Sequence, residues 1–511
     1  MSASTRSGTW AATRLSTIAR VIRRRVKPQD HPELPFVGMD NVEAHTMRLL
    51  GTVPSSTMKS ASVHFRPGDV LYGRLRPYLN KVYVPDFEGL ASAEFIPLTT
   101  PGGVVPEFLQ YRINATDFVA YASQLDEGDR PRVDYDQIAA FEVELPPSGE
   151  QRRIVEAIES YSTRLDDAVA TLERVQRNLK RYRASVLKAA VEGRLVPTEA
   201  ELARAEGRDY EPAPVLLERI LAERRRRWEE AELAKMKAKG KPPKDDKWKA
   251  KYPEPEAVHI SALPVLPEGW VWTSVDAVGD VLLGRQRAPQ FLTGRYSRPY
   301  LRVANIKDDR IDYSDLEEMD FDAAHFEKYR LKPGDILVSE GQSPERLGQS
   351  AIYSGGIDGL CFQKTLHRFR PISFGPSSEF AQLVFRAHVK SGVFKKLGSI
   401  TTNIAHLTLI KFKSAPFPLP PLGEQKRITN ETERLLSIVY ELKSSNIAHI
   451  VRCARLRQSL LKWAFAGRLV DQDPTDEPAS RLLERIEAER ESTNGDPRRS
   501  RRRPRARSSK A

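Results

Sequence analysis

The chain has 511 residues, with 81 Lys and Arg against 68 Asp and Glu and a formal net charge of +13. This length exceeds what one ordinary core serves, and only two Cys, Cys361 and Cys453, exclude a disulfide framework and a thiolate-rich zinc site. The charge is weak evidence for nucleic acid, because seven Arg and one Lys at 498–511 leave +5 for the rest. No segment approaches a membrane span, so we expect a soluble cytoplasmic protein.

Residues 1–143 predict a mixed α/β domain, because short β-type runs alternate with turns rich in Pro and Gly. Within it, basic and aromatic side chains alternate along the loop at 73–81, GRLRPYLNK. That pattern suits nucleic acid, since Arg can bind a guanine edge and Lys a phosphate, but a solvated loop with packed tyrosines explains it equally well. A segment at 129–133 is expected at the same surface. The candidates for DNA contact are Arg74, Arg76, Tyr78, Lys81, Arg130 and Arg132.

Residues 144–197 predict one long helix. Pro147 stops the preceding strand, Ser148 is the expected N-cap with Gln151 three residues later, and Gly193 marks the end. An ordinary long helix on its own domain is the alternative to a coiled coil. The apolar residues follow at alternating intervals of four and three, the a/d seam of a coiled coil, at Ile154, Ile158, Tyr161, Leu165, Ala168, Leu172, Val175, Leu179, Tyr182 and Val186.

Residues 198–262 predict a charged surface arm, a helix followed by a stretch rich in Lys and Pro. The helix start VLLERI at 215–220 has a counterpart, RLLERI at 481–486, so the arm belongs to a repeat. We favour docking of a partner over an inert solvated helix. The remainder, 472–511, predicts a short helix and a disordered Arg-rich end.

Residues 263–418 predict a second mixed α/β domain. KPGDIL at 332–337 matches RPGDVL at 66–71, but the next residues, SEGQSPERLGQSAIY at 339–353, differ from those of the first domain. One scaffold with different loop residues is expected if each domain recognises something different. The candidates for DNA contact here are Gln342, Ser343 and Arg346.

Residues 419–471 repeat the first long helix 274 positions later, from LPPSGEQ at 145–151 and EGRLV at 192–196 to LPPLGEQ at 419–425 and AGRLV at 466–470. Polar residues that can fix the register interrupt its seam, at Thr432, Asn446, His449 and Cys453. We predict an α+β chain with a pseudo-twofold repeat, in which two long antiparallel coiled-coil helices separate the two domains. Heptads 165–171 and 439–445 are then the pair to remove in a test of the spacing.

Catalytic motifs are missing from the sequence. There is no GxxxxGK[ST] phosphate loop, neither double proline has the flanks of an amino-methyltransferase pocket, and the nine His lack HxxxH or HxH spacing. An acidic fragment at 245–247 has no flanking strand to position it. We therefore expect neither a catalytic site nor a metal site.

Two copies of PPxGEQ, each followed by a GRL motif in phase, resemble the specificity subunit of a type I restriction-modification system, over nearly the whole chain. The residues that carry this resemblance are Pro146, Pro147, Gly149, Glu150, Gln151, Arg153, Gly193, Arg194 and Leu195, with Pro420, Pro421, Gly423, Glu424, Gln425, Arg427, Gly467, Arg468 and Leu469.

The resemblance implies that each domain is a target recognition domain for half of a bipartite, asymmetric double-stranded DNA target. The chain itself would be non-catalytic, directing adenine methylation and restriction by two modification subunits and by restriction subunits that hold S-adenosylmethionine, ATP and Mg. A free-standing methyltransferase or nuclease and a coiled-coil scaffold without DNA binding are the alternatives. The residues expected to serve the helix motif or a partner subunit are Glu150, Gln151, Arg153, Arg194, Glu424, Gln425, Arg427 and Arg468.

Overall fold

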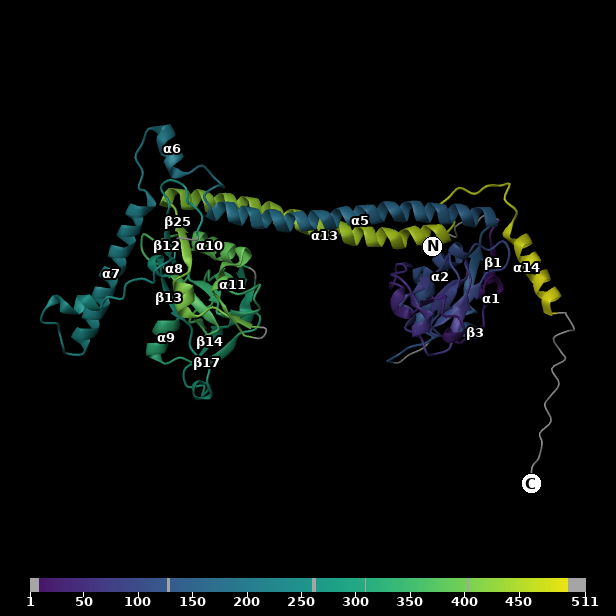
Figure 1. Cartoon of the computed structure of the whole chain (residues 1–511), viewed down its shortest axis with the longest axis horizontal. Coiled ribbons are helices and arrows are strands. Elements are labelled where there is room, and N and C mark those ends of the chain that lie inside the picture. The colour runs from purple at the N-terminus through teal and green to yellow at the C-terminus, as the bar shows by residue number, and fades with distance from the viewer. Residues whose placement is uncertain (1–8, 126–128, 260–262, 308, 402–403, 495–511) are drawn as a thin grey trace, which may run out of the picture. The chain divides into compact units, whose positions relative to one another are not determined.

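The computed structural model describes residues 9–125, 129–259, 263–307, 309–401 and 404–494 (Figure 1). Its contacts divide the chain into unit 1, residues 1–173 and 447–511, and unit 2, residues 174–446. The Arg-rich end at 498–511 lies outside the described residues. None of the helices in the described ranges is both long and apolar enough to cross a membrane.

Unit 1 contains two sheets and a two-stranded ribbon. The strand orders are β2-β10-β7-β8 and β3-β6-β9-β4-β5, and the ribbon pairs β1 with β11. The strands are β1 (Ala11–Arg14), β2 (Arg20–Val21), β3 (Arg25–Val26), β4 (Pro35–Val37), β5 (Val53–Pro54), β6 (Ser62–Phe65), β7 (Val70–Gly73), β8 (Val82–Tyr83), β9 (Gly89–Ala91), β10 (Phe95–Thr99) and β11 (Glu142–Leu145). The helices are α1 (Leu15–Ile18), α2 (Pro106–Asn114), α3 (Thr116–Ser123), α4 (Tyr135–Ile138) and α14 (Ala479–Asn494).

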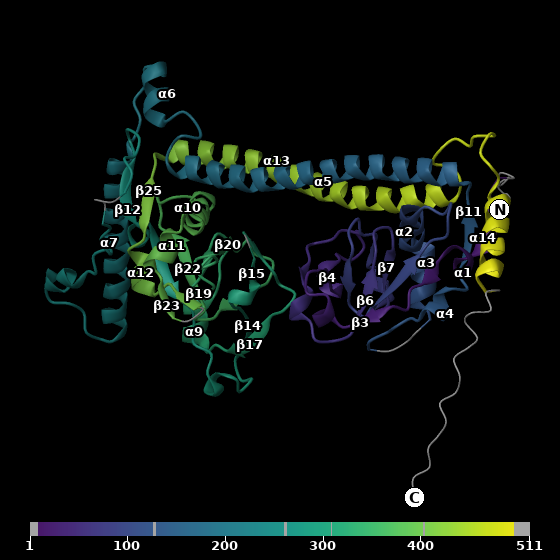
Figure 2. The ribbon, with the colours of Figure 1, turned by 45° about the vertical axis from the view of Figure 1, so that its right-hand side comes forward.

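Unit 2 repeats the ribbon as β12-β25 and the four-stranded sheet as β13-β22-β18-β20, and adds small sheets β17-β14-β21, β15-β16 and β19-β24-β23 (Figure 2). Its strands are β12 (Val271–Ser274), β13 (Gly279–Leu283), β14 (Ser297–Leu301), β15 (Ile306–Lys307), β16 (Arg310–Ile311), β17 (Glu317–Asp320), β18 (Ile336–Ser339), β19 (Gly341–Gln342), β20 (Ser350–Ile352), β21 (Cys361–Phe362), β22 (Leu366–Pro371), β23 (Ser399–Thr401), β24 (Ile404–His406) and β25 (Pro416–Leu419). Its helices are α6 (Glu199–Glu206), α7 (Ala213–Ala238), α8 (Val275–Val278), α9 (Ala323–Tyr329), α10 (Ser378–Ser391), α11 (Val393–Leu397) and α12 (Leu409–Lys413).

The RPGD and KPGD motifs form the same turn before β7 and β18. Asp69 accepts a hydrogen bond from the backbone N–H of Arg66 at 2.7 Å, and Asp335 accepts one from Lys332 at 2.8 Å. The glycine of each turn has a positive φ, 84° at Gly68 and 92° in the second copy, which glycine adopts without strain. The turn therefore delivers the chain into a buried strand in both units.

The long helices α5 (Ser148–Val191) and α13 (Leu422–Phe465) have 44 residues each. Within unit 1 Asp166 of α5 pairs with Arg457 of α13, and within unit 2 Arg183 of α5 stacks on the ring of Tyr440 at 5.4 Å. The two numbers run in opposite directions, so the helices pair antiparallel in both units. The predicted antiparallel coiled coil is confirmed.

The predicted seam of α5 is wrong at every second position. Tyr161, Val175 and Tyr182 are 47%, 39% and 46% exposed, and the residue after each of them lies closer to α13. A shift of one residue preserves the alternation of fours and threes, so apolar spacing alone does not distinguish the two phases. Arg183 shows why a polar side chain wins, since it contacts both Tyr440 and, at 3.7 Å, Asp309.

The polar seam of α13 agrees with expectation at two positions, because Thr432 and Asn446 are buried. Leu442 and Leu456, predicted in the seam, are 50% and 45% exposed. The helices therefore carry apolar side chains on their outer surface as well as between them.

Hydrogen bonds at the start of α5 also differ from the predicted capping box. Ser148 is already helical, and its hydroxyl donates to the backbone oxygen of Gly103 at 2.6 Å. The Gln151 amide, expected to reach back to the cap, binds Val105 and Pro146 instead. The motif therefore ties the helix to its domain.

The predicted surface arm is partly core. Ala213, Leu216 and Ile220 of α7 are buried in the core of unit 2, and Leu482 and Ile486 of α14 are buried in the core of unit 1. Periodic Leu and Ile in both copies explain this burial, which the charged composition of the segments conceals. Only the outer part of α7 and the residues after it are a surface arm.

Candidate nucleic-acid interface

A buried carboxylate joins three segments of unit 2 at the start of α13. The Glu424 side chain is fully buried and accepts hydrogen bonds from Trp270 Nε1 at 2.9 Å and from the backbone N–H of Glu199 at 2.8 Å. Burial raises the pKa of the Glu424 carboxyl, and the two donors oppose that rise. The end of α5 meets the same indole, because a side chain on Gly193 would approach Trp270 at 3.1 Å.

Unit 1 has the corresponding junction at the start of α5. Burial raises the pKa of the Glu150 carboxyl, which is 1% exposed, and the Trp10 indole opposes the rise, although no direct hydrogen bond joins the two side chains. Gly467 at the end of α13 lies against the Trp10 ring. Each junction thus combines the GEQ motif of one long helix with the GRL motif of the other.

The two motif glutamines fasten the domain to the helix. Gln151 Oε1 accepts from the backbone N–H of Val105, where α2 begins, at 2.9 Å. Gln425 Oε1 accepts from the backbone N–H of Ser377, the N-cap of α10, at 3.3 Å. Both glutamines are buried, so the Glu and Gln of the motifs have no surface left for a partner subunit.

The motif arginines lie nearer the surface. Arg153 binds Asp476 at 2.7 Å, and Arg427 binds Glu199 at 2.7 Å. Arg194 and Arg468 follow the glycine that ends each long helix, and both are exposed. A contact between these arginines and a partner subunit stays a prediction.

The loop between β7 and β8 lies beside the segment before α4, as expected for the first candidate site. Leu75 forms an antiparallel bridge with Arg132, the N–H of Arg76 donates to Pro131 O at 2.8 Å, and the N–H of Val133 donates to Arg74 O at 3.1 Å. This pairing holds Arg76 in the left-handed region, at φ 53°. The two predicted segments therefore form one surface.

The candidate side chains at this surface divide into two groups. Arg74 pairs with Asp134, Arg132 pairs with Glu94 at 2.6 Å, and Lys81 donates to the backbone oxygen of Met39 at 2.6 Å. These three shape the loop. The side chains exposed to solvent and available for a ligand are those of Arg76, Tyr78 and Arg130.

The loop between β18 and β20 occupies the same place in unit 2. Gly341 pairs with His406, and the N–H of Glu340 donates to Thr365 O at 2.9 Å just as the N–H of Arg74 donates to Glu94 O. Gln342 and Ser343 are half-buried there, while Arg346 is exposed. The three candidates of the second domain thus lie on a frame equivalent to that of the first.

Comparisons with known proteins agree with this arrangement. Residues 267–449 match the family model of the type I restriction modification DNA specificity domain. The chain is 28% identical over 371 residues to the type I restriction enzyme EcoAI specificity subunit of Escherichia coli, covering 61% of this chain and 56% of that one. It is 26% identical over 367 residues to the StySPI specificity subunit of Salmonella potsdam, covering 69% and 65%.

This chain belongs to the family of type I restriction-modification specificity subunits. It spans about half the length of the first curated relatives that it matches. The fold is also shared with the HsdS subunit from Thermoanaerobacter tengcongensis, with a TM-score of 0.52 and 19% identity over 90% of this chain and 97% of that one. A chain from a structure of type I restriction-modification complex assembly gives 0.64 and 18%, covering 90% and 99%.

Sequence reasoning missed Glu340 and His406 in this specificity subunit. The His406 ring lies 3.3 Å from the Glu340 carboxylate, with 45% and 22% of the side chains exposed. They occupy the frame positions of Arg132 and Arg74, respectively, in unit 1. The signal was available, because the interval of 266 residues between the PGD turns pairs 74 with 340, and the helix interval of 274 pairs 132 with 406.

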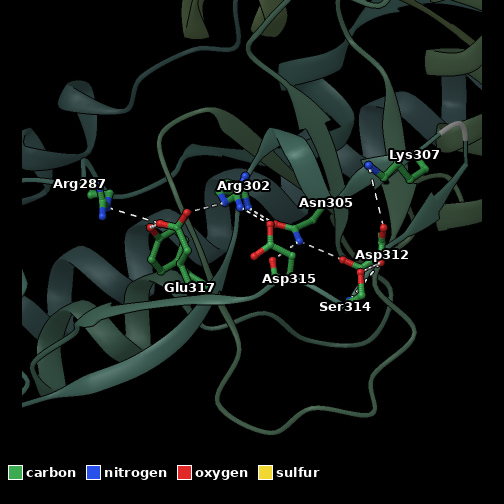
Figure 3. A network of polar contacts seen from close by, with 9 residues as sticks. Arg287, Arg302, Asn305, Lys307, Asp312, Ser314, Asp315 and Glu317 are labelled. Atoms are coloured by element: carbon green, nitrogen blue, oxygen red, sulfur yellow. Dashed lines mark hydrogen bonds and ion pairs between the residues drawn. The ribbon is translucent and has the colours of Figure 1, made fainter. Parts of the chain in front are cut away.

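A second polar cluster of the specificity subunit surrounds the start of β17 in unit 2 (Figure 3). Glu317 accepts hydrogen bonds from the Tyr300 hydroxyl at 2.5 Å and lies 2.9 Å from Arg302 Nε and 3.5 Å from Arg287 Nε. The Tyr300 hydrogen bond lowers the pKa of Glu317, and burial raises that of Tyr300 to about 12. Arg287 remains half exposed, so the cluster fixes a surface cation that the sequence did not single out.

Proposed function

We propose that the chain recognises double-stranded DNA, with the domain of each unit binding one part of a bipartite, asymmetric target. The observation that carries the proposal is the pair of equivalent loops after β7 and β18. One frame presents Arg76, Tyr78 and Arg130 in unit 1, and Glu340, His406 and Arg346 in unit 2. Different hydrogen-bonding groups on one frame are what two different base sequences require.

The proposal assigns the chemistry to partner subunits. Two modification subunits would methylate adenine with S-adenosylmethionine, restriction subunits would use ATP and Mg, and this chain would be non-catalytic. Methylation of a base within a duplex requires that the base leave the stack, so a modification subunit must lie beside each domain. The exposed apolar side chains of the long helices suit such partners, at Tyr161, Tyr182, Leu442, Leu456 and Trp463.

A direct test is methylome sequencing of a host that expresses the modification subunit with and without this chain. We expect adenine methylation at one bipartite motif only when both are present. The purified chain incubated with S-adenosylmethionine and DNA is expected to transfer no methyl group. Methyl transfer by the chain alone, or a motif without a gap, would contradict the proposal.

Variants of the two loops should affect different halves of the motif. If Arg76 binds a guanine edge, Arg76→Ala should cost about 1–3 kcal/mol of binding and relax one position in one half-site, and His406→Ala should act on the other half-site. The measurement is binding of the assembled complex to duplexes carrying every single substitution of the motif. Each variant is the control for the other. Equal weakening on all sequences would identify a phosphate contact, and an unchanged profile would remove that loop from the interface.

A further inference from the structure

The outer part of the arm in unit 2 is an ordered hairpin. Ion pairs one turn apart, including Arg225 to Glu229 at 3.1 Å, support α7. The helix ends at a left-handed Gly240, and the chain returns through Pro242 and Pro243 into a 3₁₀ turn, Asp246–Lys251.

Aromatic side chains hold the hairpin closed. The ring of Trp248 stacks on that of Trp228 at 5.9 Å, and Tyr252 meets Trp228 edge-on at 5.5 Å. Arg224 donates to the Tyr252 hydroxyl at 2.9 Å. The same arginine lies 3.3 Å from Asp276, a buried carboxylate of α8, so the hairpin is fastened to the domain of unit 2.

The hairpin carries a concentrated positive charge. Residues 235–251 contain eight Lys, two Asp and no Arg. Within the described part of the chain, five of these lysines are exposed and form no ion pair, at Lys237, Lys239, Lys241, Lys244 and Lys251. Lys is a compact point charge that binds phosphate without the planar fork that reads a guanine edge.

The repeat carries a second observation. The equivalent helix of unit 1 is also followed by a basic run, since 498–511 contains seven Arg and one Lys and begins 12 residues after Ile486, while the lysines begin 15 residues after Ile220. The two runs differ in sequence but share their sign and their place after the VLLERI or RLLERI segment. Shared charge without shared residues favours a polyanion bound through its phosphates.

We propose that the hairpin at 235–251 is a sequence-independent DNA-binding site, which contacts phosphates of the duplex outside the half-site bound by the domain of unit 2. The proposal rests on the DNA recognition proposed above. Figures 1 and 2 show the arm running from the long helices along the side of unit 2, so that its hairpin lies away from those helices, at the level of α9 and β17. An acidic protein docked on the long helices would not meet it there.

The test compares salt dependence of binding, because each phosphate contact releases counterions and adds about 0.9 to the slope of log affinity against log salt. The full chain, assembled with the modification subunit, is titrated with duplexes that end at the target or extend about fifteen base pairs beyond either end. The variant replaces Lys237, Lys239, Lys241, Lys244 and Lys251 with Gln, and the matched control replaces the same five with Arg.

On the duplex extended at one end, the Gln variant should lose at least two units of slope, and the Arg control should keep the slope of the unchanged protein. All three should agree on the duplex without extensions, and the methylated motif should stay the same. An unchanged slope of the Gln variant on both extended duplexes would overturn the proposal, also if the lysines bind an acidic protein instead. Absence of any preference for the target in the unchanged protein would count against the proposed function, whereas the slopes on random duplexes still test the hairpin.

Discussion

Removing one heptad from each long helix, at positions that face each other, is expected to shorten the gap between the half-sites by about three base pairs. Seven helical residues rise about 10 Å, and base pairs are about 3.4 Å apart. Within unit 1, Asp166 faces Arg457, so residues 165–171 of α5 lie opposite 452–458 of α13. Deleting these two stretches leaves the remaining pairs in register and both half-sites unchanged.

The sequence suggested a different pair of heptads, 165–171 and 439–445, which are equivalent in the repeat. In an antiparallel pair, equivalent residues do not face each other, so that deletion would slide the intervening stretches by one heptad. Methylome sequencing of the facing deletion measures the gap directly. Deletion of 165–171 alone is the control and should impair folding or assembly, and an intact motif with an unchanged gap would show that the helices do not set the spacing.

Glu424→Ala is expected to destabilise unit 2 by roughly 2–6 kcal/mol. The substitution removes the acceptor of two buried donors, the Trp270 indole and the backbone N–H of Glu199, and an unsatisfied buried donor costs about 1–3 kcal/mol. Calorimetric unfolding of the full chain measures the loss. The control is Glu431→Ala on the same helix, where the ion pair with Arg434 lies at the surface and contributes about 0–1 kcal/mol. Equal losses in the two variants would contradict the role of the junction.

The same carboxyl should make stability depend on pH. Its folded-state pKa is raised above the usual value of 4.5, so the folded chain holds this proton at a higher pH than the unfolded chain does. The contribution is fully present below 4.5 and is lost as the pH rises through the folded pKa. Glu424→Gln cannot ionise and should flatten the unfolding profile across that window. A profile as steep as that of the unchanged protein would assign the dependence to other groups.

The repeated motifs predicted the two domains and the paired helices, because turn residues and apolar spacing act locally. The sequence also brought Arg130 and Arg132 to the surface of the first loop correctly, since a short segment before the last strand has few other places to lie. Burial of Glu150 and Gln151 was not predictable, because their partners, Trp10 and Val105, are distant in sequence. Charged motif residues usually indicate a surface, and only the junction shows that these are internal.

The junction of unit 1 has a consequence for the order of the chain. Trp10 lies against Gly467, and the N–H of Ala479 donates to the backbone oxygen of Thr9 at 2.9 Å, so the first described residues adjoin the segment that follows α13. The packing of the two repeats therefore forms a closed ring, which the polypeptide interrupts in unit 1 and continues through the linker at 207–212 in unit 2. A circular permutant, opened at that linker and rejoined beside Thr9, would retain every junction.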